Sequence, residues 1–201
     1  MDTNKKLKVK DIFTVVLLAL INVVIFFASS LLYATPVTIM LMPVFFSLLE
    51  GIVFFIIGTR VRKPGAMMVY AVVRGILGGY LPYVLLYFLS GIASELILRK
   101  SGYGSAKGLT ISYILCQLFA ALGSTIYPYV IAAKSMADMA VTDGRQGNID
   151  AASRMLLSGG WIALLAGIVV SAFIGAMIGK RVVKKHLQAV GMEGQHQETA
   201  V

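Results

Sequence analysis

The positive charges of this chain lie in short clusters between long apolar stretches, and the clusters occupy alternate gaps. Fourteen of the 18 lysines and arginines belong to four such clusters, at residues 5–10, 60–63, 99–107 and 180–185. Positive residues resist translocation, so the cytoplasmic segments of membrane proteins carry this excess. The pattern therefore predicts a polytopic membrane protein with an even number of spans and both termini in the cytoplasm.

The composition agrees with a membrane protein. The chain is 58% hydrophobic and 13% charged, whereas a soluble domain carries about 25% charged residues. A net charge of +9 is also found in nucleic-acid-binding proteins, but here the basic residues flank apolar segments and form no surface interleaved with aromatic residues. We expect them to orient the chain and to contact anionic lipid. The expected partner is the bilayer, and nucleic acid is not expected.

The apolar stretches have the lengths of membrane helices. A spanning helix needs about 20 residues at about 1.5 Å each. Six helices are predicted, at about 11–33, 37–58, 65–79, 82–98, 108–131 and 157–183. The first is too long for the apolar core of a signal peptide, and the third and fourth are short for full spans. We predict an all-α fold with six transmembrane helices in one domain, residues 1–185, and a polar, disordered tail, residues 186–201.

The longest polar segment between spans is the extracellular loop 134–156. Its charges balance, and short helices are expected at 135–141 and 148–156, lying over the outer face. A loop of this length is more often functional than passive. The sequence favours a lid over a simple connector and leaves both open.

Three ionisable residues, Glu50, Arg74 and Glu95, lie inside predicted spans. An unpaired charge at mid-membrane costs at least about 2.5–3.5 kcal/mol, so partners are expected. Glu50 and Arg74 each lie nine residues from the inner end of their helix, at a depth of about 13–14 Å, which predicts an ion pair. The pair serves either to set helix register or to place Arg74 on an anionic substrate group. Glu95 is expected to pair with Arg99, four residues on.

Polar and aromatic residues gather near the outer ends of the helices. Tyrosines there often form only an interfacial belt, yet several accompany glycine- and proline-containing turns. Together they are able to line an apolar, outward-facing pocket with a few polar groups. The residues predicted to line it are Asn22, Arg74, Tyr80, Tyr83, Tyr87, Gln117 and Tyr127.

The sequence lacks the residues that several kinds of site would need. There is no phosphate-binding glycine loop, the single Cys116 lies in an apolar stretch, and both histidines lie in the tail. We therefore expect no metal, no cofactor and no catalysis. An enzyme embedded in the membrane would need convergent polar groups near mid-membrane, where only Glu50 and Arg74 qualify.

Small residues recur every fourth position of the last helix, at Gly167, Ser171, Gly175 and Gly179. Such a stripe lets a neighbouring backbone approach closely. The neighbour is either another helix of this chain or a partner subunit, so these residues are candidates for partner docking.

Three short motifs carry a family resemblance: the opening Lys6–Ile12, the inner turn Arg62–Ala66, and Gly91–Glu95 ahead of the loop Gly102–Lys107. With the six-helix topology, they are similar to the Trep_Strep branch of the substrate-binding subunits of energy-coupling-factor (ECF) transporters. The resemblance implies a subunit of the bacterial cell membrane that binds a scarce nutrient outside. It implies association with a transmembrane coupling protein and two ATPases, whose ATP hydrolysis topples the subunit and releases its cargo inside. Family members dock through small residues of the first helix, where this chain offers Ala19.

The resemblance also narrows the cargo. Metal-binding members use N-terminal histidines, which this chain lacks, so a vitamin-like compound or a tetrapyrrole such as haem is implied. Haem iron would need tyrosine or methionine as an axial ligand, and Met136, Met139, Tyr83 and Tyr127 are the positions available outside. The alternative is a structural or regulatory membrane subunit without a ligand, which would have a closed outer face.

Overall fold

The computed structural model describes residues 6–28, 32, 34–134 and 146–198, with side chains described as far as residue 185. Its elements are α1 (Val9–Ala28), α2 (Pro36–Arg60), α3 (Ala66–Leu77), α4 (Leu81–Ser101), α5 (Ala106–Ala121), the π-helix η2 (Leu122–Ile131), α7 (Gln146–Met155), the π-helix η3 (Leu156–Gly160) and α8 (Trp161–Glu198). Within these described ranges all regular structure is helical, which confirms the predicted all-α fold.

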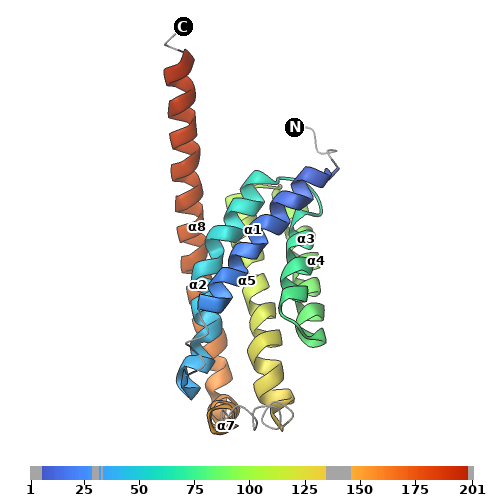
Figure 1. The fold of residues 1–201 in the computed structure, drawn as a ribbon, viewed down its shortest axis with the longest axis vertical. Coiled ribbons are helices and arrows are strands. Elements are labelled where there is room, and N and C mark those ends of the chain that lie inside the picture. Colours follow the sequence, from blue (N-terminus) through green and yellow to red (C-terminus); the bar gives the residue numbers. More distant parts are fainter. Residues whose placement is uncertain (1–5, 29–31, 33, 135–145, 199–201) are drawn as a thin grey trace.

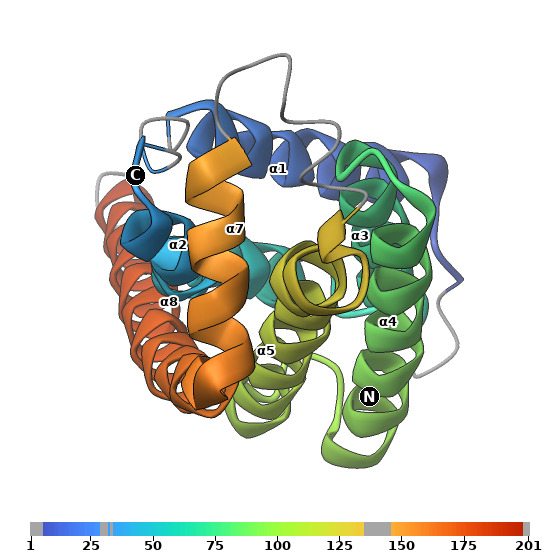
Figure 2. The ribbon, with the colours of Figure 1, turned by 90° about the horizontal axis from the view of Figure 1, so that it is seen from below.

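Six helical rods form the bundle, because η2 continues α5 and η3 leads into α8 (Figure 1). Five are long and apolar enough to cross a membrane, and α3 is shorter, with 12 residues. Both ends of the chain lie at one end of the bundle, and α7 lies across the other (Figures 1 and 2). By the distribution of basic residues, α7 is at the extracellular end.

The last helix differs from the sequence prediction. It was expected to end near residue 183, with a disordered tail from residue 186, but α8 continues to Glu198. The fifth rod ends at Ile131, as predicted, but its last ten residues, Leu122–Ile131, form the π-helix η2, which contains Pro128. Such π-segments occur frequently at functional sites.

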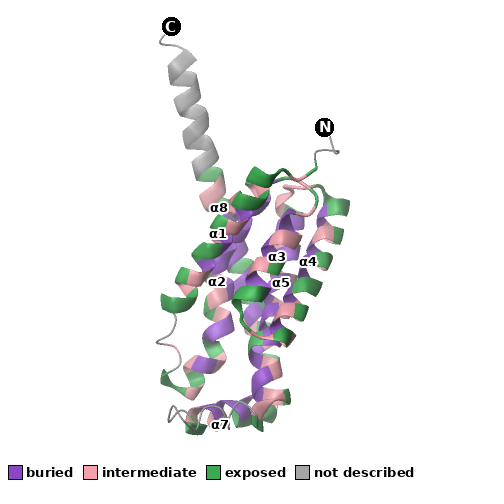
Figure 3. Ribbon diagram, turned by 45° about the vertical axis from the view of Figure 1, so that its right-hand side comes forward, coloured by how far each residue is buried: buried purple, intermediate pink, exposed green. Residues whose placement is uncertain are grey.

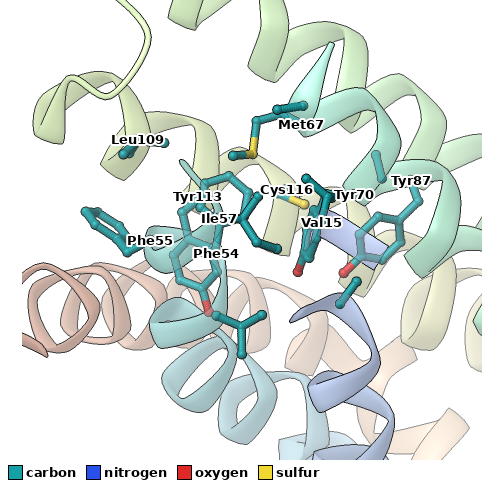
Figure 4. Close-up of a cluster of buried hydrophobic side chains, with 14 of the residues drawn as sticks. Val15, Phe54, Phe55, Ile57, Met67, Tyr70, Tyr87, Leu109, Tyr113 and Cys116 are labelled. Atoms are coloured by element: carbon teal, nitrogen blue, oxygen red, sulfur yellow. The ribbon is translucent and has the colours of Figure 1, made fainter. Parts of the chain in front are cut away.

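The inner half of the bundle is filled by apolar side chains, several of them aromatic (Figure 4). The ring of Phe54 on α2 lies 5.4 Å from that of Tyr70 and 5.2 Å from that of Tyr113, measured between centroids. Tyr113 also donates a hydrogen bond of 2.7 Å to the carbonyl oxygen of Ser47. These contacts tie α2, α3 and α5 together.

Helices α2 and α8 approach each other closely through the predicted stripe of small residues. A Cβ at Gly175 would overlap the carbonyl oxygens of Ser47 and Leu48, and a Cβ at Gly179 would overlap that of Gly51. Ser171 hydrogen-bonds to Ser47 across the same interface.

The stripe is therefore occupied within the chain, which corrects its assignment to partner docking. Gly167 makes only ordinary contact, with Val44 of α2. Ala19 of α1 is also completely buried, so its side chain is not available to a partner. The exposed apolar residues lie instead on outward faces, such as that of α1 (Figure 3).

Candidate functional site

The outer half of the bundle encloses a cavity of about 590 Å³. Its lining comes from α1, α2, α3, the start of α4, the junction of α5 and η2, and α7. The α3–α4 turn ends short of the level of α7 (Figure 1), so the bundle is incomplete on that side of its outer half. The volume lies within the range of about 300–1,000 Å³ that is usual for small-molecule sites.

Charged and amide groups form the floor of the cavity. Arg74 of α3 donates a hydrogen bond from Nη2 to Oε1 of Glu50 on α2. Gln117 of α5 donates from Nε2 to the other carboxylate oxygen, Oε2, over 3.1 Å. The guanidinium carbon of Arg74 lies 5.6 Å from the centre of the Tyr87 ring. Three helices thus meet at one charge-paired, hydrogen-bonded group.

One wall is a row of three tyrosines on α4 and the turn before it. The rings of Tyr80 and Tyr83 are stacked, with centroids 6.0 Å apart, and those of Tyr83 and Tyr87 lie 4.9 Å apart. Two glycines make room for the middle ring, because a Cβ at Gly78 would overlap it and one at Gly123 would press against it. The row presents aromatic surface from the floor to the outer rim.

The opposite wall is apolar and belongs to α1 and α2. Phe26 of α1 stacks on Phe46 of α2, with centroids 6.1 Å apart and an interplanar angle of 14°. Met42 and Ile39 continue this wall toward the outer end of α2. From Glu50 to Ile39 is eleven residues, or about 16 Å along a helix, so the apolar wall runs from the floor to the outer end of the cavity.

The outer end of the cavity is bounded by η2 and α7. Ser124, Thr125 and Pro128 line it from η2, and Ile149 lines it from α7. Below α7, the buried side chains of Ala152 and Leu156 belong to an apolar cluster shared with α2, η2 and α8. Helix α7 is thus seated on the bundle, with one residue reaching the cavity. This position is compatible with a lid and with a connector.

A family model described as "Hypothetical bacterial integral membrane protein (Trep_Strep)" matches residues 9–188. The chain belongs to the Trep_Strep family. No curated protein and no solved structure matches it significantly. The family description agrees with the membrane location predicted from the basic clusters and with the bacterial origin that the resemblance implied.

Five of the residues predicted to bind a ligand line the cavity of this Trep_Strep protein: Arg74, Tyr80, Tyr83, Tyr87 and Gln117. Two predicted residues do not. Asn22 is completely buried and donates a hydrogen bond of 3.0 Å from Nδ2 to the Tyr70 hydroxyl, and Tyr127 is absent from the lining. Met136 and Met139 lie outside the described residues.

Glu95 has different partners from the expected Arg99. Its Oε1 accepts a hydrogen bond of 3.0 Å from the backbone N–H of Met67, in the first turn of α3, and its Oε2 accepts one of 3.1 Å from the Tyr103 hydroxyl. Four-residue spacing along one helix predicted the Arg99 pair, but a free helix N-terminus on the neighbouring rod offered a closer donor. Glu95 therefore stabilises the inner end of α3 and takes no part in the cavity.

The apolar wall was not predicted from the sequence. Phe26, Met42 and Phe46 belong to uninterrupted apolar runs, in which residues facing a cavity look the same as residues facing lipid. No group of three or more His, Cys, Asp or Glu side chains that could hold a metal ion occurs in the described part of the chain. The cavity thus combines an aromatic row, an apolar wall and a small polar floor.

Proposed function

We propose that this Trep_Strep protein is the substrate-binding subunit of an ECF-type importer and that it captures a small nutrient in the outer cavity. The observation that carries the proposal is the contrast between the two halves of the bundle. The inner half is packed with apolar side chains, whereas the outer half leaves about 590 Å³ open above a buried ion pair. A bundle with only a structural role would gain stability by filling that space.

The alternative, a structural or regulatory subunit without a ligand, predicts a closed outer face. The cavity argues against that alternative. Of the two expected cargo classes, a vitamin-sized compound suits the tyrosine row, whose ring faces are able to stack on a flat molecule. Haem binding stays a prediction, because Met136 and Met139, two of the expected axial ligands, lie outside the described residues.

Transport would need partners. The sequence has no phosphate-binding glycine loop, so energy would come from two ATPase subunits acting through a transmembrane coupling protein, as the family resemblance implies. The stripe on α8 is occupied by α2, which leaves outward faces for docking. One candidate is the face of α1 that carries Phe13, Leu17 and Val24, which are exposed by 64%, 51% and 68%.

The test is to identify a compound that co-purifies with the protein. Protein purified from its native membrane is extracted with solvent, and the extract is analysed by mass spectrometry. Ser124 lines the cavity and is itself exposed, so Ser124→Trp should fill the outer end without disturbing the core. Leu85→Trp is the matched control, because Leu85 is 54% exposed on the outside of α4 and is not part of the lining.

We expect a stoichiometric compound with the wild type and Leu85→Trp, and its loss with Ser124→Trp. A compound retained equally by all three proteins, or no compound in any of them, would contradict the proposal.

A further inference from the structure

The floor of the cavity has no unbalanced charge. Arg74 is ionised at all physiological pH values, and its partner is the carboxylate of Glu50. Both carboxylate oxygens already accept hydrogen bonds, one from Arg74 and one from Gln117. A ligand therefore meets an ion pair that carries no net charge.

An ionised head group would be costly there. An anion next to the pair would place a second negative charge close to Glu50 in a site shielded from water. A cation would lie beside the positive charge of Arg74, and the Glu50 carboxylate already serves Arg74 as its counter-ion. Buried charges without their own counter-ion cost several kcal/mol, so the floor disfavours both signs.

Two polar groups of the lining, Nε of Arg74 and the hydroxyl of Tyr87, are buried and have no hydrogen-bond partner among the described residues. The Nε–H of Arg74 is the charged donor of the two, and its side chain is only 9% exposed. Arg74 is part of the cavity lining, so a ligand atom seated on the floor would be the natural acceptor for this N–H group. A buried donor without a partner is destabilising, which a carbonyl or ring acceptor of the ligand would relieve.

The walls of the cavity indicate what the rest of the ligand would be. Above the floor, Phe46, Met42 and Ile39 follow one another along α2, and the tyrosine row faces the cavity from α4. We infer that the cavity selects an uncharged compound with a hydrogen-bond-accepting head on Arg74 and a largely apolar, ring-containing body along the aromatic walls. This inference rests on the proposed function, because it specifies the ligand of the same cavity.

The experiment uses a complex bacterial growth medium as the source of compounds. The medium is separated by ion exchange at pH 7 into anionic, cationic and uncharged pools. Each pool is added to the full-length protein in phosphatidylcholine nanodiscs, and thermal unfolding is recorded. We expect only the uncharged pool to raise Tm, by about 5 °C at saturation. We expect this shift to be absent in Ser124→Trp and present in Leu85→Trp.

The outcomes distinguish the inferred uncharged head group from the proposed substrate-binding function. A rise in Tm with the anionic or cationic pool, blocked by Ser124→Trp, would overturn the uncharged head group while supporting the proposed function. No rise with any pool or with unfractionated medium would overturn both. Glu50→Gln provides a second readout, because it leaves Arg74 without its counter-ion. We expect the anionic pool to raise the Tm of Glu50→Gln. If only the uncharged pool still raised its Tm, the role given to the ion pair would be overturned.

Discussion

Arg74 of α3 and Glu50 of α2 form an ion pair in which both side chains are almost completely buried. The two residues belong to consecutive helices joined by a short inner turn. Gln117 extends the pair to α5. The group therefore has two functions in this account, since it holds three helices in register and forms the floor of the cavity.

Removing either partner should destabilise the protein, and by unequal amounts. Glu50→Ala leaves a guanidinium that cannot lose its proton, and breaking a buried pair in this way costs about 3–5 kcal/mol. Arg74→Ala leaves a carboxyl group that is able to take up a proton and become neutral, so its cost should be smaller. Unfolding of both variants in mixed micelles, by titration with dodecyl sulfate, measures the difference. Equal costs, or a larger cost for Arg74→Ala, would contradict this explanation.

The close contact of α2 and α8 should be sensitive to a single methyl group. Gly175→Ala places a Cβ against backbone carbonyl oxygens of α2, which cannot move aside easily, and overpacking of this kind costs about 1–3 kcal/mol. Gly167→Ala is the matched control, because its Cβ would meet only Val44 at 3.6 Å, an ordinary contact. Thermal unfolding in detergent should show a lower Tm for Gly175→Ala alone. If Gly175→Ala and Gly167→Ala had the same Tm, α2 and α8 would not be in the contact described.

Glu95 should stabilise the inner end of α3, whereas Arg99 should contribute little to its stability. Glu95→Ala removes the acceptor for the Met67 N–H and for the Tyr103 hydroxyl, and loss of a helix cap costs about 0.5–2 kcal/mol. Arg99→Ala should change the free energy of unfolding little, because Arg99 is exposed and Glu95 bonds elsewhere. Hydrogen exchange of the amides at the start of α3 provides the local measurement. Faster exchange with Arg99→Ala as well would restore the pairing first expected from the sequence.

Tyr103, in the loop between α4 and α5, should titrate at a higher pH than an ordinary tyrosine. Burial, the negative charge of Glu95 and the hydrogen bond to Glu95 raise the pKa of Tyr103 to about 12. An unfolded tyrosine titrates near pH ~10, so any stabilisation from the neutral hydroxyl is complete below that pH and is lost as the pH rises through about 12. The tyrosinate absorbance of the wild type minus that of Tyr103→Phe isolates this group. A difference that titrates near pH ~10 would show that the hydroxyl is free of Glu95.

The topology and the charged floor were accessible from the sequence, because both depend on rare residues. The basic clusters are conspicuous between apolar stretches, and Glu50 and Arg74 share a depth that register alone predicts. The apolar wall was not accessible, because Phe26 and Phe46 stack through tertiary contact and their sequence context is that of a lipid-facing helix. The stripe on α8 predicted a close contact correctly, but nothing in its spacing identified α2 as the neighbour.

The central claim is that the cavity opens to the cell exterior and holds a ligand there. Labelling of Ser124→Cys with a membrane-impermeant maleimide in intact cells tests it most directly, with the buried Cys116 replaced by alanine. We expect labelling from outside, severalfold slower after incubation with complex growth medium, and no labelling of the lipid-facing control Leu85→Cys. A Ser124→Cys protein that reacts only after the cells are broken open, or at a rate that medium leaves unchanged, would contradict the account.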